Sequence, residues 1–269
     1  MSVKNRSFFI LTMLLFFTSC QNDNNIINAN CIQGEGTVTT EILPINSFNK
    51  INLAFASSVI LYQGATQEVF VTGHPNIIAL LKRDVVNGLF VLELEDGCYN
   101  NYQLSVHITT PNIEQLLLSG SGDMVVNSFA NQNNLVIDLA GSGDMIISNF
   151  EGAENMKIDL AGSGDLTING FEGTEILDIN LAGSGDIIAN SNVTNLATFT
   201  LNLGGSGNYN GFPLSAEDCV VSLSGSGNAN LTASNTLGVT IGGSGNVSYK
   251  GTPTITQNIF GSGFLLNAN

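Results

Sequence analysis

The sequence IDLAGSGDLTI at residues 158–168 decides the fold of this chain. Apolar side chains alternate with polar ones on both sides of a central Gly-Ser-Gly triplet, and this period of two is typical of strands with one buried face. The same design stands one unit earlier, as IDLAGSGDMII at 137–147, and one unit later, as INLAGSGDIIA at 179–189. Each unit therefore predicts a strand, a bend at the triplet, and a second strand.

The triplet recurs at intervals of 18 to 22 residues through the second half of the chain. Its first glycines are Gly120, Gly141, Gly162, Gly183, Gly205, Gly225, Gly243 and Gly261. A unit of this length cannot bury its own apolar face, so successive units must stack on one another. Parallel stacking predicts an all-β solenoid, a parallel β-helix. A propeller does not fit, because its blades need about 40–45 residues.

Residues 37–115 lack the triplet but contain short runs with strand character. These runs are Asn49–Leu53, Val59–Tyr62, Val69–Val71, Leu89–Leu92 and Leu104–Ile108. Pro75–Val85 has apolar residues near helical spacing and predicts one short helix. An uncovered solenoid end exposes an unpaired strand edge. We therefore expect 37–115 to form an irregular β cap continuous with the first coils of the repeat region, 116–269, with a separate small β domain as the alternative.

Residues 1–19 have the features of a secretory signal peptide. Lys4 and Arg6 precede an apolar run, Phe8–Phe17, which is too short to span a bilayer core of roughly 20 helical residues. No second apolar stretch is long enough to do so. We therefore expect an exported protein that is anchored to a membrane and does not cross it.

The anchor that we expect is a lipid on Cys20. The sequence Phe-Thr-Ser-Cys at 17–20 has the pattern of a lipobox, although leucine is usual where Phe17 stands. Acyl chains on this cysteine would hold the protein in the cell envelope, for which we expect the outer membrane, with residues 20–36 as lipidated cysteine and disordered tether. Cleavage at an ordinary signal site nearby is the alternative.

The composition restricts the partners. The formal net charge is −15, and it becomes −17 once Lys4 and Arg6 leave with the signal peptide. So acidic a surface repels phosphate backbones, which argues against nucleic acid as a partner. Hydrophobic residues make up 43% of the chain, which favours a packed interior over disorder.

Export implies an oxidising compartment, so the remaining cysteines matter. Cys31 and Cys98 both lie in the N-terminal part, and we expect a disulfide between them. Cys219 precedes Val220 and Val221 at a strand start and is expected to be a small buried residue. None of these spacings is that of a zinc site.

Acidic residues follow the first bends and amides follow the later ones. Asp123, Asp144, Asp165 and Asp186 are succeeded by Asn208, Asn228 and Asn246. Asp and Asn share a role in tight turns, where they bond to their own nearby backbone beside glycines with positive φ, and we expect that role here. A calcium ladder on the stacked carboxylates and a carbohydrate-contacting face are the alternatives. We therefore expect no cofactor, with calcium on this ladder as the alternative.

Catalytic machinery is hard to find in this sequence. General acid–base catalysis needs paired carboxylates or a histidine in a pocket, and the two histidines, His74 and His107, lie in a predicted turn and on a predicted strand face. We therefore predict no catalytic residues. Tyr99 and Tyr102 form the most plausible exposed aromatic pair and are candidates for a ligand-binding loop, with an ordinary surface loop as the alternative.

The motifs together resemble a known family. The lipobox-like start, the segments Phe48–Ile51 and Val59–Gly64, and the repeated Gly-Ser-Gly-Asp/Asn motif are similar to the putative auto-transporter adhesin, head GIN domain family of Bacteroidetes-type envelope lipoproteins. The likeness covers about Ile45–Leu266. It implies a right-handed, single-stranded β-helix at the cell envelope with an adhesin role, and it offers no catalytic residues to transfer.

We therefore expect a non-catalytic envelope lipoprotein that acts as an adhesin or as a polymer- or glycan-binding module. Its expected partners are the membrane, through the lipid anchor, and glycans or surface proteins. One alternative is a polysaccharide-acting enzyme of the pectin lyase or hydrolase type, because such enzymes use similar folds. The other is a structural spacer of the envelope.

Overall fold

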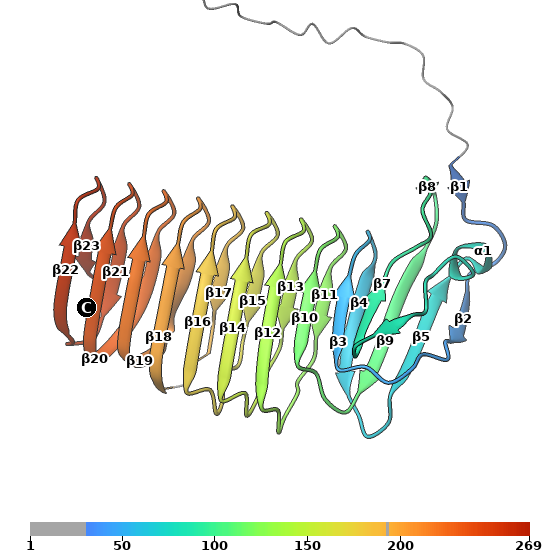
Figure 1. Ribbon diagram of the computed structural model, residues 1–269, viewed down its shortest axis with the longest axis horizontal. Helices are drawn as coiled ribbons and strands as arrows, with labels where there is room; N and C mark the ends of the chain where they lie inside the picture. The colour runs from blue at the N-terminus through green and yellow to red at the C-terminus, as the bar shows by residue number, and fades with distance from the viewer. Residues whose placement is uncertain (1–30, 192–193) are drawn as a thin grey trace, which may run out of the picture.

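The computed structural model describes residues 31–191 and 194–269. The chain winds into a right-handed parallel β-solenoid, which confirms the fold predicted from the repeat (Figure 1). The predicted signal peptide and Cys20 lie outside the described residues. Among the residues described, no helix has the length and apolar character needed to cross a bilayer.

Two stacks of strands form the walls of the repeat region. The strands that precede a bend are β10 (Gln115–Leu118), β12 (Asn134–Leu139), β14 (Asn155–Leu160), β16 (Ile176–Leu181), β18 (Thr194–Leu203) and β22 (Thr254–Ile259). The strands that follow a bend are β11 (Met124–Val126), β13 (Met145–Ile147), β15 (Leu166–Ile168), β17 (Ile187–Ala189), β21 (Val247–Lys250) and β23 (Leu265–Asn267). Two long strands, β19 (Tyr209–Leu223) and β20 (Ala229–Ile241), follow one bend and run on to the next.

Successive coils are aligned in parallel register. Ile137 pairs with Ile158, and Leu139 pairs with Leu160. Equivalent apolar side chains therefore stack in columns inside the solenoid, where these four residues are no more than 1% exposed. The alternation seen in the sequence thus places its apolar half in the core and its polar half on the outer faces.

The Gly-Ser-Gly triplets are required by close packing between coils, which corrects our expectation of positive φ at the bends. Glycines with positive φ in the described chain include Gly152 and Gly173, in turns after the bends, but none of the triplet glycines. A Cβ added to Gly143 would instead overlap the carbonyl oxygen of Gly122 in the preceding coil, and Gly164 stands in the same relation to Gly143. Only glycine lets the bends stack this closely.

Aromatic side chains fill the interior near the far turns. Phe129, Phe150 and Phe171 are all buried. The rings of Phe129 and Phe150 are stacked with centroids 5.9 Å apart. These rings continue the aliphatic columns across the wider part of the coil.

The N-terminal part adds nine strands and a helix. They are β1 (Ile32–Gln33), β2 (Thr39–Ile42), β3 (Lys50–Leu53), β4 (Ser58–Gln63), β5 (Glu68–Gly73), α1 (Pro75–Ile78), β6 (Val85–Val86), β7 (Leu89–Leu92), β8 (Tyr99–Asn100) and β9 (Leu104–Thr110). The strands expected here are all present, but the helix expected over Pro75–Val85 ends at Ile78. It ends early because the chain must extend again, so that Leu81 can bridge to Leu94 and β6 can form a hairpin with β7.

Coil order in space differs from coil order in sequence at this end. β3 lies between β7 and β10, and β4 lies between β9 and β11, all in parallel register. The chain thus builds the β3–β4 coil first, adds the β7 and β9 strands on its outer side, and returns to its inner side with β10. A repeat search cannot reveal this exchange, because β3 and β4 are joined by Ala54–Ser57 in place of a Gly-Ser-Gly triplet.

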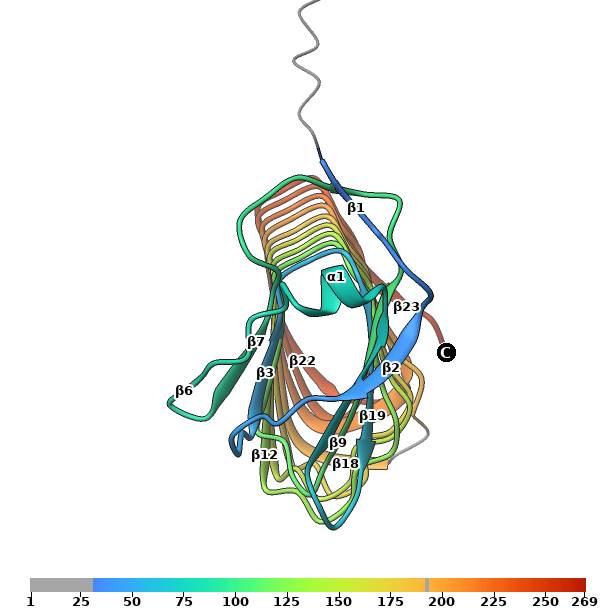
Figure 2. The same ribbon diagram turned by 90° about the vertical axis from the view of Figure 1, so that its right-hand side faces the viewer.

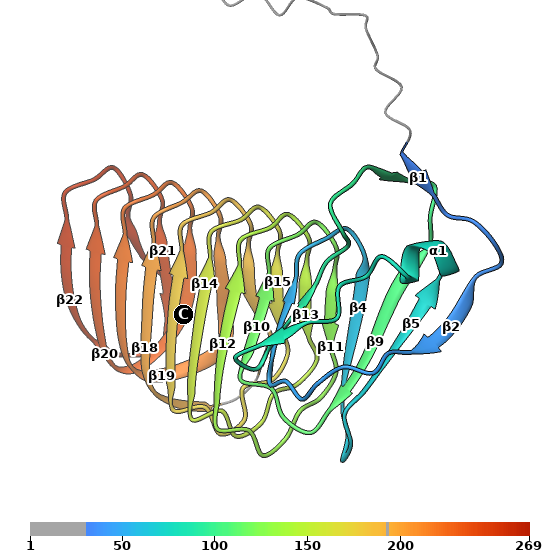
Figure 3. The ribbon, with the colours of Figure 1, turned by 45° about the vertical axis from the view of Figure 1, so that its right-hand side comes forward.

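A cap closes the N-terminal end of the solenoid. β5 runs antiparallel to β9, and β2 runs antiparallel to β5, so this sheet extends beyond the parallel coils (Figure 3). α1 lies across the end of the coil, with Ile77 and Ile78 buried (Figure 2). The core of the first coils is therefore covered.

The last part of the segment expected to be a tether, residues 31–36, is folded into the cap. Cys31 forms a disulfide with Cys98, across a Cα–Cα distance of 4.5 Å, and β1 pairs in parallel with β8. Residues 31–36 therefore belong to the cap, which corrects their assignment to the tether. The sequence concealed this because the strand is only two residues long and depends on the disulfide partner for its position.

Candidate functional site

The Asp and Asn residues that follow the bends form a continuous hydrogen-bonded column. Oδ1 of Asp123 accepts the backbone N–H of Asp144 at 3.0 Å, and Oδ1 of Asp144 accepts that of Asp165 at 2.8 Å. The same bond recurs from coil to coil through Asp165, Asp186, Asn208, Asn228, Asn246 and Phe264. Each side chain serves a donor of the next coil, which corrects our expectation of a bond within its own turn.

This geometry explains why Asp and Asn interchange along the column. Both side chains offer the Oδ1 acceptor that the next backbone N–H needs. At the change from acid to amide, Asn208 also donates its own Nδ2 to Oδ1 of Asp186 at 2.9 Å. Within the described residues, no group of three or more His, Cys, Asp or Glu side chains is arranged to hold a metal ion. Calcium binding along the column remains a prediction.

A second polar column runs along the outer face of the other sheet. Nδ2 of Asn180 donates to Oδ1 of Asp159 at 2.7 Å, and Nδ2 of Asn202 donates to Oδ1 of Asn180 at 2.9 Å. Lys157 forms an ion pair with Asp159, and this hydrogen bond raises the pKa of the Lys157 ammonium group. The face therefore presents amide and carboxylate groups at the spacing of the coils.

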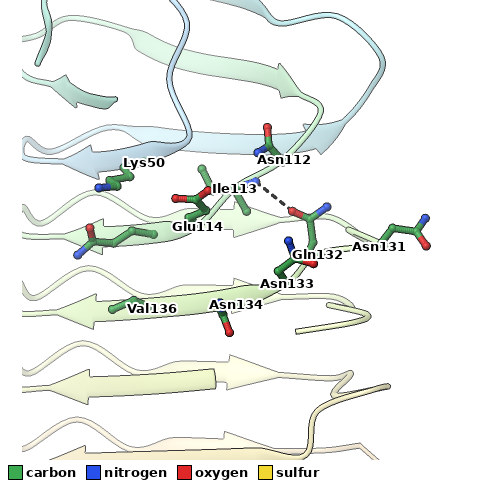
Figure 4. A pocket seen from close by; sticks show the side chains of 10 residues that line it. Lys50, Asn112, Ile113, Glu114, Asn131, Gln132, Asn133, Asn134 and Val136 are labelled. Carbon is green, nitrogen blue, oxygen red and sulfur yellow. Dashed lines mark hydrogen bonds between the residues drawn. The ribbon is translucent and has the colours of Figure 1, made fainter. Parts of the chain in front are cut away.

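This face leads to a polar cleft of about 460 Å³ at the starts of β3, β10 and β12 (Figure 4). Its lining residues are Lys50, Asn112, Ile113, Glu114, Gln115, Asn131, Gln132, Asn133, Asn134 and Val136. Most of them carry an amide or a charge. The volume falls within the range of about 300–1,000 Å³ that is common for small-molecule sites.

Gln132 holds the wall of the cleft in place. Its equivalents in the next two turns are Ala153 and Thr174, and all three positions are buried. The longer Gln132 side chain accepts the backbone N–H of Ile113 at 3.1 Å and donates to the carbonyl of Ala130 at 2.8 Å. These bonds tie the chain entering β10 to the first turn of the repeat, so the cleft rests on a fixed backbone.

The cleft offers the chemistry that carbohydrates require. Amide groups donate and accept, as sugar hydroxyls do, and the Lys50 ammonium group and the Glu114 carboxylate add one charge of each sign. The residues of this cleft were not among the sites predicted from the sequence. The sequence signal for the cleft is the run Asn131-Gln132-Asn133-Asn134, which stands where the next coils have Gly-containing turns. Asn131 has a positive φ of 57°, and the equivalent Gly152 also has a positive φ.

The aromatic pair singled out in the sequence is half-buried. Tyr99 and Tyr102 meet edge to face, with centroids 6.1 Å apart, and both pack against the core. The hydroxyl of Tyr99 donates to the carbonyl of Glu95 at 2.6 Å, and partial burial raises the pKa of this phenol. The rings therefore support the loop closed by the Cys31–Cys98 disulfide and lie apart from the cleft.

The histidines and the free cysteine do not line the cleft. His74 accepts the backbone N–H of Gln103 through Nδ1 at 3.0 Å, while His107 lies exposed on β9 beside the ring of Tyr62. Cys219 is buried, and that burial raises the pKa of its thiol to about 12. A protonated, inaccessible thiol is a poor nucleophile.

Similar folds are known from crystal structures of chains with low sequence identity. A putative lipid binding protein from Parabacteroides distasonis is 22% identical, with a TM-score of 0.74, and a putative adhesin from the same species is 17% identical, with a TM-score of 0.73. A putative adhesin from Bacteroides fragilis is 23% identical, with a TM-score of 0.61. Each comparison covers 88% of this chain and 99% of the other, and at such identities they show the shared fold. No curated protein matches the chain significantly.

The architecture defines a parallel β-solenoid with polar outer faces. The family described as "Putative auto-transporter adhesin, head GIN domain" matches residues 47–191 and 152–253, which together span well over half of the sequence. The chain belongs to this family. Membership of an adhesin-type family fits a protein of the cell envelope or surface.

Proposed function

We propose that the protein is a non-catalytic, envelope-anchored binding module that recognises glycans or related polymers through the cleft lined by Lys50, Glu114 and their amide neighbours. The observation that carries this proposal is that the cleft is continuous with the polar column on the neighbouring outer face. Gln115 lines the cleft and donates to Oδ2 of Asp138 at 2.8 Å, at the head of the outer face. A polymer seated in the cleft could continue along this face.

Binding, and not catalysis, is supported by the arrangement of the acids. The exposed carboxylates are spaced along columns, and Asp138 and Asp159, which could imitate a glycosidase pair, are engaged by Gln115, Lys157 and Asn180. A glycosidase needs two carboxyl groups that face one scissile bond. In the cleft, Glu114 is the one carboxylate among the lining residues.

The test is a glycan array probed with the soluble mature chain from Gln21, with and without calcium. We expect selective binding to a small set of glycans. A variant carrying Glu114→Gln with Asn133→Ala should lose at least about tenfold in affinity, the equivalent of about 1.4 kcal/mol. The matched control is Glu217→Gln with Asn235→Ala, which makes the same chemical changes on distant coils and should bind normally.

Each outcome has a distinct meaning. Equal binding by the cleft variant and wild type would place recognition elsewhere on the surface. Silence across the array would overturn glycan recognition and favour a spacer role in the envelope. Loss of binding on calcium removal alone would point to the carboxylates from Asp123 to Asp186.

We propose further that the anchor is a lipid on Cys20, which would leave the solenoid outside the bilayer. Metabolic labelling with palmitate tests this directly. Wild type should incorporate label and fractionate with outer membranes, while Cys20→Ser should do neither. Labelling of the Cys20→Ser variant would contradict this site of attachment.

A further inference from the structure

The last coil of the described chain presents an unpaired strand edge. In the described structure, β22 pairs only with β20, and β23 only with β21. Every residue of β22 is exposed. Edge strands present unpaired backbone N–H and C=O groups to any strand that approaches, and natural proteins usually cover or charge them.

This edge also exposes the ends of the core columns. Ile255 and Ile259 are 37% and 39% exposed, whereas Leu237 and Ile241, their partners one coil earlier, are fully buried. At the adjoining bend, the exposed large apolar side chains are Phe260 (71%), Phe264 (65%) and Leu266 (46%). Such clusters on soluble proteins mark interaction surfaces.

Charge distinguishes this end from the rest of the molecule. The chain carries a formal charge of −15, yet no acidic residue follows Asp218, and residues 251–269 contain no charged side chain. Two copies meeting through the coils up to Asp218 would bring acidic side chains together, whereas at this end side-chain repulsion is absent. Because this edge is uncharged and exposes apolar side chains, the same edge of a second copy can pack against it.

In the described residues, the opposite end offers this edge a poorer partner. α1 covers the core there, and the outermost strand of the cap, β2, is four residues long and carries Glu41. The covered core at that end favours an isologous pairing, with the same surface contributed by both copies, over head-to-tail stacking.

We propose that the last coil is a homodimerisation surface, through which two copies of this chain join tail to tail. Main-chain pairing between the two edges would supply hydrogen bonds, and the exposed apolar side chains would be buried between them. The anchor proposed at Cys20 lies in sequence next to the cap, at the far end, and does not compete with this contact.

Sedimentation velocity of the soluble mature chain tests the proposal. Wild type should sediment with twice the mass of one chain at high micromolar concentration. Phe260→Asp with Phe264→Asp should halve that mass, because two carboxylates per copy would meet across the contact. Val220→Asp, a control at a residue 54% exposed on a lateral face, should remain dimeric.

A second variant guards against loss of folding. If the circular dichroism of the double variant differs from wild type, Leu266→Lys serves in its place and should give the same halved mass. Wild type that stays monomeric up to about 100 μM, corresponding to a binding free energy weaker than about 5.5 kcal/mol, would overturn the proposal. Dimers that survive both variants would overturn it as well.

Discussion

The two ends of this solenoid solve the same physical problem in different ways. At the N-terminal end, the core is covered by α1 and by the antiparallel strands β5 and β2, and the Cys31–Cys98 disulfide ties the segment down. At the C-terminal end, the last coil follows the pattern except for Gln257, which takes an apolar position, and its edge is exposed. A repeat cannot cover itself, so a cap must come from a different sequence or from another chain.

The difference shows that the regularity of the repeat and the covering of the core at an end are separate properties of the solenoid. The repeated coils are stable because each bend, side-chain column and hydrogen-bonded ladder contacts an equivalent coil on both sides. The last coil has a neighbour on one side only within the described structure. Substitutions of the same kind should therefore have different effects at the middle and at the open end.

The largest effect should follow from filling the space between bends. Gly143→Ala places a Cβ against the carbonyl of Gly122, and neither bend can move because further coils hold them, so we expect a loss of about 4 kcal/mol or more in the free energy of unfolding. Gly263→Ala makes the same overlap with Gly245, but the last coil can lift away, so the loss should stay below about 1 kcal/mol.

Urea unfolding at constant m-value measures both losses. Gly204→Ala is the control, because its added Cβ would meet only the Ser224 hydroxyl at an ordinary 3.7 Å. Equal losses at Gly143 and Gly263 would show that the last coil is held as firmly as the middle.

The next effect should come from opening the cap. The disulfide closes a loop with a sequence separation of 67 residues, so its removal should cost about 2–4 kcal/mol. The comparison is the urea midpoint with and without a reductant, repeated with Cys31→Ser plus Cys98→Ser. If neither treatment moves the midpoint, the cap does not unfold together with the coils.

A smaller effect should follow from breaking one rung of the Asp/Asn column. Asp144→Ala removes the acceptor for the N–H of Asp165 and should cost about 1 kcal/mol. Asp144→Asn keeps the acceptor and removes a like charge from the stack, so its stability should match or slightly exceed that of wild type. Thermal unfolding distinguishes them, and a loss in the Asn variant equal to that in the Ala variant would mean that the charge itself is needed.

The smallest effect concerns Cys219, two strands inside the open edge. Burial raises the pKa of this thiol from 9.0 to about 12, so the unfolded chain releases a proton at a lower pH than the folded chain. Stability should therefore be unaffected well below pH 9 and should begin to fall near pH 9, where about 0.4 kcal/mol is lost.

A thiol reagent at pH 8 gives the matching kinetic test. Cys219 should react only at the rate of unfolding, because fraying of the last coil does not reach β19. Rapid labelling of the native protein would show that the openness of this end extends through β20.

The sequence predicted the repeat region well because its signals are local and repeated. The apolar column members of the inner coils, such as Ile158 and Leu160, have the burial that their alternation required. The triplets marked the bends correctly, although the reason for glycine is contact between coils. That reason depends on a neighbour about twenty residues away, which no single unit contains.

The remaining features depend on contacts between distant segments. The exchange of coil order around β3 and β4 is set by pairings across the cap, and the cleft requires the chain near Ile113 to meet the turn at Gln132. The helix is shorter than predicted for a similar reason, because Leu81 forms a β-bridge with Leu94. Local helix and strand propensities do not predict any of these contacts between distant segments.

Hydrogen exchange at low and at high protein concentration tests most directly the central claim, that this solenoid is closed at one end and open at the other. We predict that amides of β22 and β23 exchange fastest among the strands at low concentration and become protected at high concentration, while those of β5 and β9 stay protected throughout. Protection of β22 at low concentration that equals that of β9 would contradict the open end, and exchange that ignores concentration would contradict its pairing.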